Sequence, residues 1–286
     1  MKPAAFAYHM PKTVDEAVAL LAEVAPEDGR ILAGGQSLVP IMNFRLATPG
    51  HLVDINGVAG LDKVREDAGH LVIPACVRHA AFETPVTGGP LGQLLASVVA
   101  NVAHHPIRTR GTFCGSLAHA DPASEWCLVA ATLSASLTAR SIRGERVIAA
   151  EDFFQGIMTT ALAPDEMLLE ARLPLLAEGT RFGFDEMNRR AGDFAMAMAL
   201  AVYRVEGGKI IDPRIGVGGA EGQPRRIPEA EAALAGQSPD AVAFAAAGSV
   251  AADALSDILT DARTDAAFRR DLVQSLVRRA LEKSSA

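Results

Sequence analysis

Two short segments rich in glycine and other small residues constrain this chain most, because each lies ahead of a predicted helix. The first is LAGGQSLVP at residues 32–40, and the second is TFCGS at residues 112–116. Glycines permit tight turns that bring bare N–H groups against a ligand, and a helix N-terminus adds partial positive charge. Either segment alone could be a plain turn. Together they predict a site that binds one long diphosphate ligand from two sides.

Composition and charge exclude several classes of protein. A net charge of -7, with no basic stripe, argues against a nucleic-acid partner. Three scattered cysteines (Cys76, Cys114 and Cys127) without CxxC spacing predict neither a disulfide framework nor a zinc or iron–sulfur site. The longest apolar run, residues 194–203, is about half of the ~20 residues that span a bilayer. With no signal-peptide pattern either, we expect a soluble cytoplasmic protein with no transmembrane segment.

The residue pattern predicts three units, at residues 1–56, 57–175 and 176–286. In the first, Thr13 and Glu16 have capping-box spacing ahead of a helix over residues 14–24, with strands at 30–32 and 51–55. This is a βαβ-type unit. The second is mixed, with the following predicted elements: strands at 71–73 and 167–173, a helix over 91–102, and a helix from Asp121-Pro122 through residue 131.

The last unit changes character and predicts an α+β C-terminal domain. A hairpin is expected over residues 201–211 with its turn at Gly207-Gly208, followed by a strand at 215–219 and alanine-rich helices. The fold class is therefore α+β, ending in a three-stranded antiparallel sheet with helices.

Three motifs carry a resemblance to a known family. They are AGGQSLVP at residues 33–40, IRTRGTFCGSLAHADPASE at 107–125 and RRAGDFA at 189–195. Their order and spacing resemble the FAD-binding medium subunits of the molybdenum hydroxylases, which include carbon monoxide dehydrogenase and relatives of xanthine dehydrogenase. The resemblance implies a two-subdomain FAD-binding fold of the PCMH/vanillyl-alcohol-oxidase type, followed by the C-terminal domain.

The resemblance also implies one non-covalent FAD and the residues that hold it. Backbone N–H groups of the two small-residue segments would bind the pyrophosphate, and Glu125 would accept bonds from ribityl or sugar hydroxyls. Leu168 would pack on the cofactor, and Phe194 would stand near the isoalloxazine. The full expected cofactor set, which contains no catalytic residue and no metal ligand, is Leu32, Ala33, Gly34, Gly35, Gln36, Ser37, Leu38, Val39, Val102, His105, Thr112, Cys114, Gly115, Ser116, Glu125, Leu168 and Phe194.

Three features depart from the family or leave an alternative. Cys114 stands where the family usually has a glycine, which would strain the cysteine if the position needs positive φ; a local conformation that tolerates a small side chain is the alternative. Residues 185–188 lack the lysine that many relatives carry near the flavin. His104-His105 could suggest a metal, but without a Cys or Asp cluster we favour contact with the cofactor's edge.

The function implied by the resemblance is electron transfer within a larger enzyme. A large partner subunit would carry the molybdenum cofactor and oxidise the substrate, and a small one would pass electrons from two [2Fe–2S] clusters to FAD. The acceptor would be a quinone, NAD or oxygen. The small subunit would dock near the flavin, and the assembly would be a dimer of heterotrimers. A stand-alone FAD-dependent oxidase and a structural subunit that has lost its flavin are the alternatives.

Overall fold

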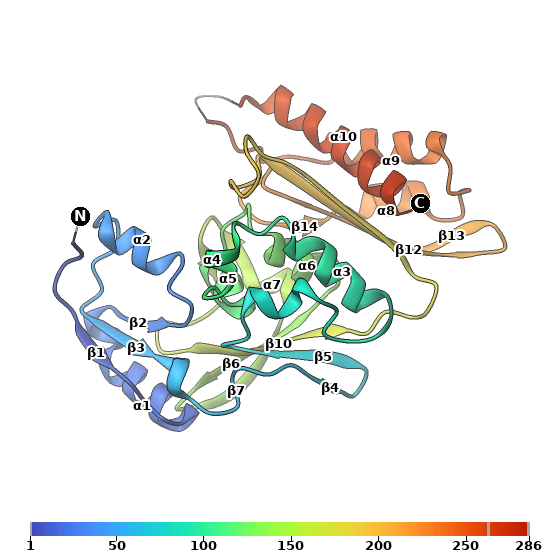
Figure 1. The fold of residues 1–286 in the computed structure, drawn as a ribbon. Coiled ribbons are helices and arrows are strands. Elements are labelled where there is room, and N and C mark those ends of the chain that lie inside the picture. Colours follow the sequence, from blue (N-terminus) through green and yellow to red (C-terminus); the bar gives the residue numbers. More distant parts are fainter. Residues whose placement is uncertain (1, 262–263, 285–286) are drawn as a thin grey trace.

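A three-stranded parallel sheet begins the chain in the computed structural model, which describes residues 2–261 and 264–284 (Figure 1). Its strands lie in the order β1 (Ala7–His9), β3 (His51–Asp54) and β2 (Gly29–Leu32). Helix α1 (Val14–Val24) buries its apolar stripe against this sheet, and Thr13 Oγ1 caps it by accepting a hydrogen bond from Glu16 N–H at 3.1 Å. These features confirm the predicted βαβ-type unit.

A five-stranded antiparallel sheet forms the middle of the molecule. Its order is β4 (Arg65–Asp67), β5 (His70–Pro74), β10 (Met167–Pro174), β6 (Ser136–Ser141) and β7 (Gly144–Ala149). Three helices lie between this sheet and the next one: α3 (Gly89–Val99), α5 (Phe113–His119) and α6 (Glu125–Thr132) (Figure 1). The shorter connecting elements are η1 (Ala25–Glu27), α2 (Leu38–Asn43), η2 (Ile55–Gly57), η3 (His79–Glu83), α4 (His105–Arg108), α7 (Ala150–Phe153), β8 (Phe154–Gly156) and β9 (Thr159–Thr160).

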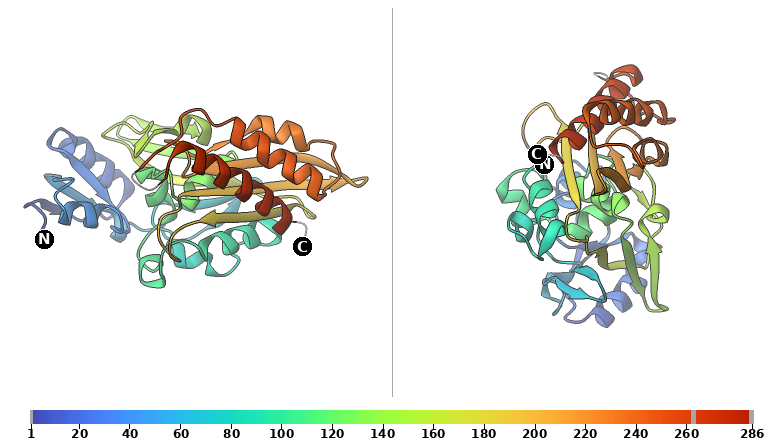
Figure 2. Two further views of the ribbon diagram at one scale, coloured as in Figure 1. Left: turned by 90° about the horizontal axis from the view of Figure 1, so that it is seen from above. Right: turned by 90° about the vertical axis from the view of Figure 1, so that its right-hand side faces the viewer.

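The C-terminal sheet is antiparallel and carries helices on its outer face (Figures 1 and 2). Its strands lie in the order β11 (Arg181–Met187), β12 (Ala197–Glu206), β13 (Lys209–Gly218) and β14 (Arg225–Arg226). The covering helices are α8 (Pro228–Leu234), α9 (Ala241–Asp253) and α10 (Ala266–Lys283). The hairpin predicted at Gly207-Gly208 joins β12 to β13. The strand expected separately at residues 215–219 is the continuation of β13, and β11 and the two-residue β14, which were not predicted, bring the sheet to four strands instead of three.

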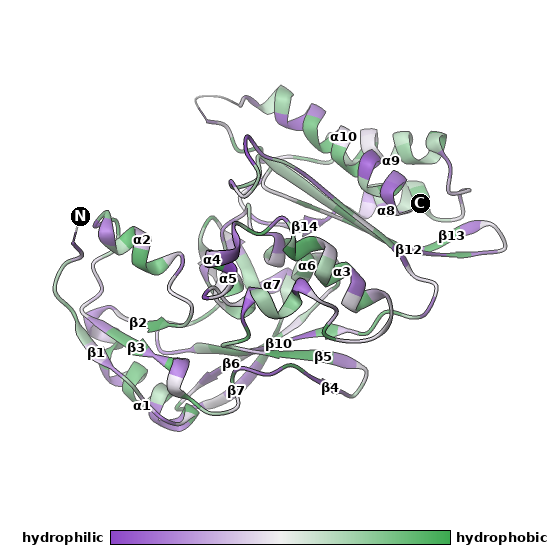
Figure 3. Cartoon of the chain, viewed as in Figure 1, coloured by the Kyte–Doolittle hydropathy of each residue, from purple (hydrophilic) through white to green (hydrophobic). Residues whose placement is uncertain are grey.

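Strand β12 joins two cores, because its apolar residues face both ways. Ala199, Ala201 and Tyr203 pack with the outer helices α8 to α10, whereas Met198, Leu200 and Val202 pack with the helices of the middle sheet. Figure 3 shows the hydrophobic residues concentrated on α3 and α6 between the two sheets. The middle and C-terminal sheets therefore share one continuous core. The N-terminal sheet and α1 have a separate core, into which Met167 of β10 projects.

Two helices have boundaries that differ from the sequence-based prediction. The helix expected to open at Asp121-Pro122 begins at Glu125, because the Asp121 carboxylate accepts a bond from Ala123 N–H at 2.9 Å and so stabilises a preceding turn. The helix expected over residues 91–102 starts two residues earlier and ends at Val99. In the ranges that the structure describes, no helix combines the length and apolar character needed to cross a membrane.

Candidate cofactor site

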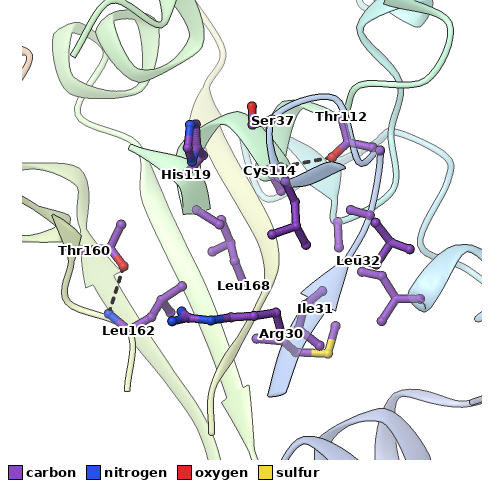
Figure 4. Close-up of a pocket in the computed structure, with 18 of the residues that line it drawn as sticks. Arg30, Ile31, Leu32, Ser37, Thr112, Cys114, His119, Thr160, Leu162 and Leu168 are labelled. Atoms are coloured by element: carbon purple, nitrogen blue, oxygen red, sulfur yellow. Dashed lines mark hydrogen bonds between the residues drawn. The ribbon is translucent and has the colours of Figure 1, made fainter. Parts of the chain in front are cut away.

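A cavity of about 790 Å³ opens where the N-terminal sheet meets α5 and the start of β10 (Figure 4). This volume lies in the range of small-molecule and cofactor pockets. Its walls come from the end of β2, the turn into α2, the first turns of α5, and residues 158–168. Both small-residue segments therefore line the same cavity, together with Leu168. The predicted residues that the structure brings together here are Leu32, Ala33, Gly34, Gly35, Gln36, Ser37, Leu38, Thr112, Cys114, Gly115, Ser116 and Leu168.

The first segment presents free backbone donors. Gly35 has a φ of 71°, a left-handed conformation that favours glycine, and it turns the chain from β2 toward α2. Among the described residues, no acceptor is paired with the N–H groups of residues 34–37. Successive N–H groups of this kind form a concavity that suits an anionic oxygen. The segment therefore fits one side of a diphosphate.

The second segment is the beginning of a helix rather than a loop. Thr112 is the N-cap of α5, and its Oγ1 accepts a hydrogen bond from Gly115 N–H at 3.0 Å. Cys114 is helical, so the strain considered for positive φ does not arise. Its buried thiol donates to the main-chain oxygen of Ile73 at 3.3 Å, and burial raises its pKa. A small apolar side chain is therefore what this position accommodates.

The first segment touches the backbone immediately ahead of the second one. A Cβ atom added to Gly34 would lie 2.4 Å from the main-chain oxygen of Arg110 and 2.6 Å from Cα of Gly111. Contact this close leaves no room for any side chain. The glycine at position 34 thus sets the separation of the two walls.

Five of the predicted residues do not line this cavity. Val39 lies on the exposed side of α2, Val102 is in the middle core, and His105 Nδ1 lies 3.1 Å from a Glu83 carboxylate oxygen. Phe194 is 72% exposed, and Glu125 occupies the first turn of α6. In the same described ranges, no three His, Cys, Asp or Glu side chains gather as metal ligands.

Glu125 instead has a carboxylate neighbour on the C-terminal sheet. Burial raises the pKa of Glu125 to about 7. Burial, and then the negative charge of Glu125, raise the pKa of Glu186 to about 8. Glu186 Oε1 accepts from Asn188 Nδ2 at 2.8 Å, while its buried Oε2 has no partner among the described residues. The structure thus brings these two carboxyl groups, which are distant in the sequence, near enough for the charge of Glu125 to act on Glu186.

A lysine from another part of the chain does lie beside residues 185–188, the segment that contains no lysine of its own. Lys283 of α10 places Nζ 3.0 Å from Oδ1 of Asp185, and Arg279 places Nε 2.7 Å from Oδ2. Both cations come from the far end of the chain. No local motif could have revealed this arrangement.

Several cavity residues were missed from the sequence. Arg30 and Ile31 lie on β2 directly before Leu32, so the predicted strand could have identified them (Figure 4). No sequence motif marks Thr160 or Leu162, which lie in the segment that runs from β9 to β10. His79 also lines the cavity; its Nδ1 accepts from Trp126 Nε1–H at 2.9 Å, and burial lowers its pKa to about 4. It is therefore neutral at pH 7.

The sequence and fold match known flavin subunits throughout. Residues 4–176 match the FAD binding domain in molybdopterin dehydrogenase, and residues 182–284 match the CO dehydrogenase flavoprotein C-terminal domain. The nicotine 6-hydroxylase medium subunit of Paenarthrobacter nicotinovorans is 38% identical over 289 residues, which cover 100% of this chain and 99% of that protein. The carbon monoxide dehydrogenase medium chain of Afipia carboxidovorans is 34% identical, over 100% of this chain and 99% of that one.

Solved structures give the same result. A chain of carbon monoxide dehydrogenase from Hydrogenophaga pseudoflava superposes with a TM-score of 0.94 at 34% identity, over 100% of this chain and 99% of that one. Quinoline 2-oxidoreductase from Pseudomonas putida 86 gives 0.93 at 35% identity, over 100% and 98%. The glycine-walled cavity with its free N–H groups fits the cofactor that the family model names. The chain therefore belongs to the FAD-binding medium subunits of the molybdopterin dehydrogenases, and FAD is its cofactor.

Proposed function

We propose that this chain is the electron-transfer subunit of a multi-subunit molybdenum hydroxylase. It would take electrons from [2Fe–2S] clusters in a small partner subunit and deliver them to an external acceptor. Substrate oxidation would take place at the molybdenum cofactor of a large partner subunit. The observation that carries this proposal is the cavity between two glycine segments, in a chain that matches medium subunits over its whole length.

The residues that line the cavity would hold FAD as follows. The free N–H groups of residues 34–37 would bind the diphosphate on one side, and the small residues Gly115 and Ser116 in the first turn of α5 would let it approach closely on the other. Leu32 and Leu168 would pack against the apolar parts of the cofactor. When bound, FAD supplies the ability to accept and release one or two electrons. The chain's own task is to orient the cofactor and to shield it.

We assign the five predicted residues outside the cavity to the isoalloxazine end of the cofactor or to its approach. The turn that leads to Phe194 rests on His104, because a Cβ atom on Gly192 would lie 2.6 Å from Cε1 of that imidazole. Glu186 lies on β11, which leads directly into this turn, and the charge of Glu125 acts on Glu186. Phe194, Glu125, Val102, Val39 and His105 are thus proposed to act around the flavin ring or its approach.

Under this proposal, this chain does not determine which substrate the whole enzyme oxidises. The relatives' names span carbon monoxide, nicotine and caffeine, yet a subunit of each of these enzymes aligns with this chain. We also propose a dimer of heterotrimers, which multi-angle light scattering of the co-expressed complex would measure. We further propose that this chain is divided into three structural units, at residues 1–56, 57–175 and 176–286.

An absorption and reduction experiment tests the proposal. The chain purified alone should show an oxidised-flavin spectrum and remain oxidised when a hydroxylase substrate is added. Co-expression with the small and large subunits should make reduction fast. Rapid reduction of the chain alone would establish a stand-alone oxidase instead. A colourless chain that cannot bind added FAD would establish a structural subunit without flavin.

A further inference from the structure

We propose that Asn56 and Arg78 form a clasp that holds the two FAD-binding segments at a fixed separation, and that both are positioning residues for FAD. Asn56 follows β3, and Arg78 precedes η3. Neither lies among the described residues that line the cavity. Any effect they have on FAD must therefore pass through the segments they hold.

The clasp is a continuous chain of hydrogen bonds from one segment to the other. Asn56 Nδ2 donates to the main-chain oxygen of Ala33 at 2.8 Å, in the first segment. Arg78 Nη2 donates to Asn56 Oδ1, and Arg78 Nη1 donates to the main-chain oxygen of Arg110, next to the second segment. Arginine only donates and a carbonyl only accepts, so a single orientation of the Asn56 amide satisfies both neighbours.

The first segment depends on this clasp more than the second. Among the described residues, the hydrogen bond from Asn56 is the one that joins residues 33–37 to a distant part of the chain; the others stay within the turn and α2. The second segment has further support, because His79 N–H donates to Gly111 O and Phe113 N–H donates to Val77 O, both at 3.0 Å. The clasp therefore ties a weakly held wall to a firmly held one.

Asn56 is itself oriented by a buried carboxylate. Oδ1 of Asp54 accepts from the backbone N–H of Asn56 at 2.8 Å and also from its side-chain amide. The second oxygen of Asp54 accepts from the hydroxyl of Tyr8 on β1. Because Asp54 holds the Asn56 side-chain amide in one orientation, its nitrogen stays directed at the main-chain oxygen of Ala33 and its oxygen at Arg78. A pre-oriented clasp lowers the conformational cost of closing both walls on the ligand.

A planar arginine is suited to this position. Two of its nitrogens reach two acceptors on different segments, which the single ammonium of lysine cannot reproduce. This separates the clasp from a second explanation, in which the positive charge of Arg78 simply attracts the phosphates of FAD. A charge effect would survive in Arg78→Lys, whereas a clasp would not.

The test measures FAD affinity of the full chain by flavin fluorescence, together with the melting temperature of the FAD-free chain. Asn56→Ala, Arg78→Ala and Arg78→Lys should each weaken FAD binding about tenfold, the size expected for losing a bond to a charged donor. The double variant Asn56→Ala/Arg78→Ala should lose no more than either single change, because the chain of bonds is already broken.

Arg204→Ala is the matched control, because Arg204 makes exposed ion pairs with Glu206 and Asp212 on the β12–β13 hairpin, where no residue lines the cavity. The control should bind FAD with the affinity of the unaltered chain. Without FAD, the clasp variants should have melting temperatures no lower than that of the control. Unchanged affinity in Asn56→Ala, full affinity in Arg78→Lys, or a double variant whose loss is the product of the two single losses would each overturn the proposal.

Discussion

A side chain added to Gly34 would start 2.4 Å from the main-chain oxygen of Arg110, so two segments far apart in sequence are in backbone contact at this glycine. Gly34→Ala should push the walls apart. We expect FAD affinity to fall at least tenfold and the melting temperature to drop, since a rigid backbone atom blocks the new methyl group. Gly222→Ala is the control, because its added Cβ would make only ordinary contacts, the nearest at 3.5 Å from Ile157. Equal behaviour of the two variants would contradict this account.

The N-cap of α5 offers a second test. Thr112→Val removes the hydroxyl that accepts from Gly115 N–H, and the loss of a cap costs about 1 kcal/mol of folding free energy. Thr112→Ser keeps the acceptor and should retain most of that stability. Urea unfolding of the FAD-free chain measures both variants. A valine variant as stable as the serine variant would show that the cap contributes nothing.

If Cys114 replaced a glycine that needs positive φ, changing it to glycine would stabilise the chain. Its helical conformation predicts that the change destabilises the chain instead. Because the residue is helical and buried, Cys114→Gly should lower the free energy of unfolding by about 1 kcal/mol or more, through lost packing and greater backbone entropy. Cys114→Ala should cost less. Burial raises the pKa of the thiol, so iodoacetamide should leave it unmodified in the native chain and react after denaturation. A glycine variant more stable than the alanine variant would restore the idea of strain.

Glu186 should make stability depend on pH. Its pKa rises from 4.5 in the unfolded chain to about 8, mainly through burial, so folding favours the protonated form. This contribution is fully present below pH 4.5 and is lost as the pH rises toward 8. The melting temperature of Glu186→Gln, minus that of the unaltered chain, should therefore increase over this interval. The exposed Glu178→Gln should show no such increase, and parallel profiles for the two variants would refute the assignment.

The sequence predicted those parts of the fold that local chemistry determines. Thr13 and the apolar stripe of α1 specify a helix on their own, and Gly207-Gly208 specifies the hairpin turn. The glycines at 34 and 35 marked the cavity wall for the same reason, since few other residues fit a tight turn.

What the sequence could not show depends on contacts between distant residues. The start of α6 was misplaced because Asp121 can cap a helix or a turn, and only the packing that follows selects the turn. The pairing of Lys283 with Asp185 results from how α10 docks on β11, and the approach of Glu125 to Glu186 from how α6 packs against the C-terminal sheet. The clasp residues Asn56 and Arg78 likewise belong to no motif.

The core shared by the middle and C-terminal sheets means that the boundary between the two matched family regions is not a folding boundary. Residues 126–132 of α6 are all buried, and Phe184, Met198 and Leu200 from beyond that boundary belong to the same cluster. A chain cut near residue 176 would leave this helix open to water and prone to aggregate. The flavin-binding half is therefore not autonomous: both halves should unfold in a single cooperative transition, and evolution could exchange them only as one piece.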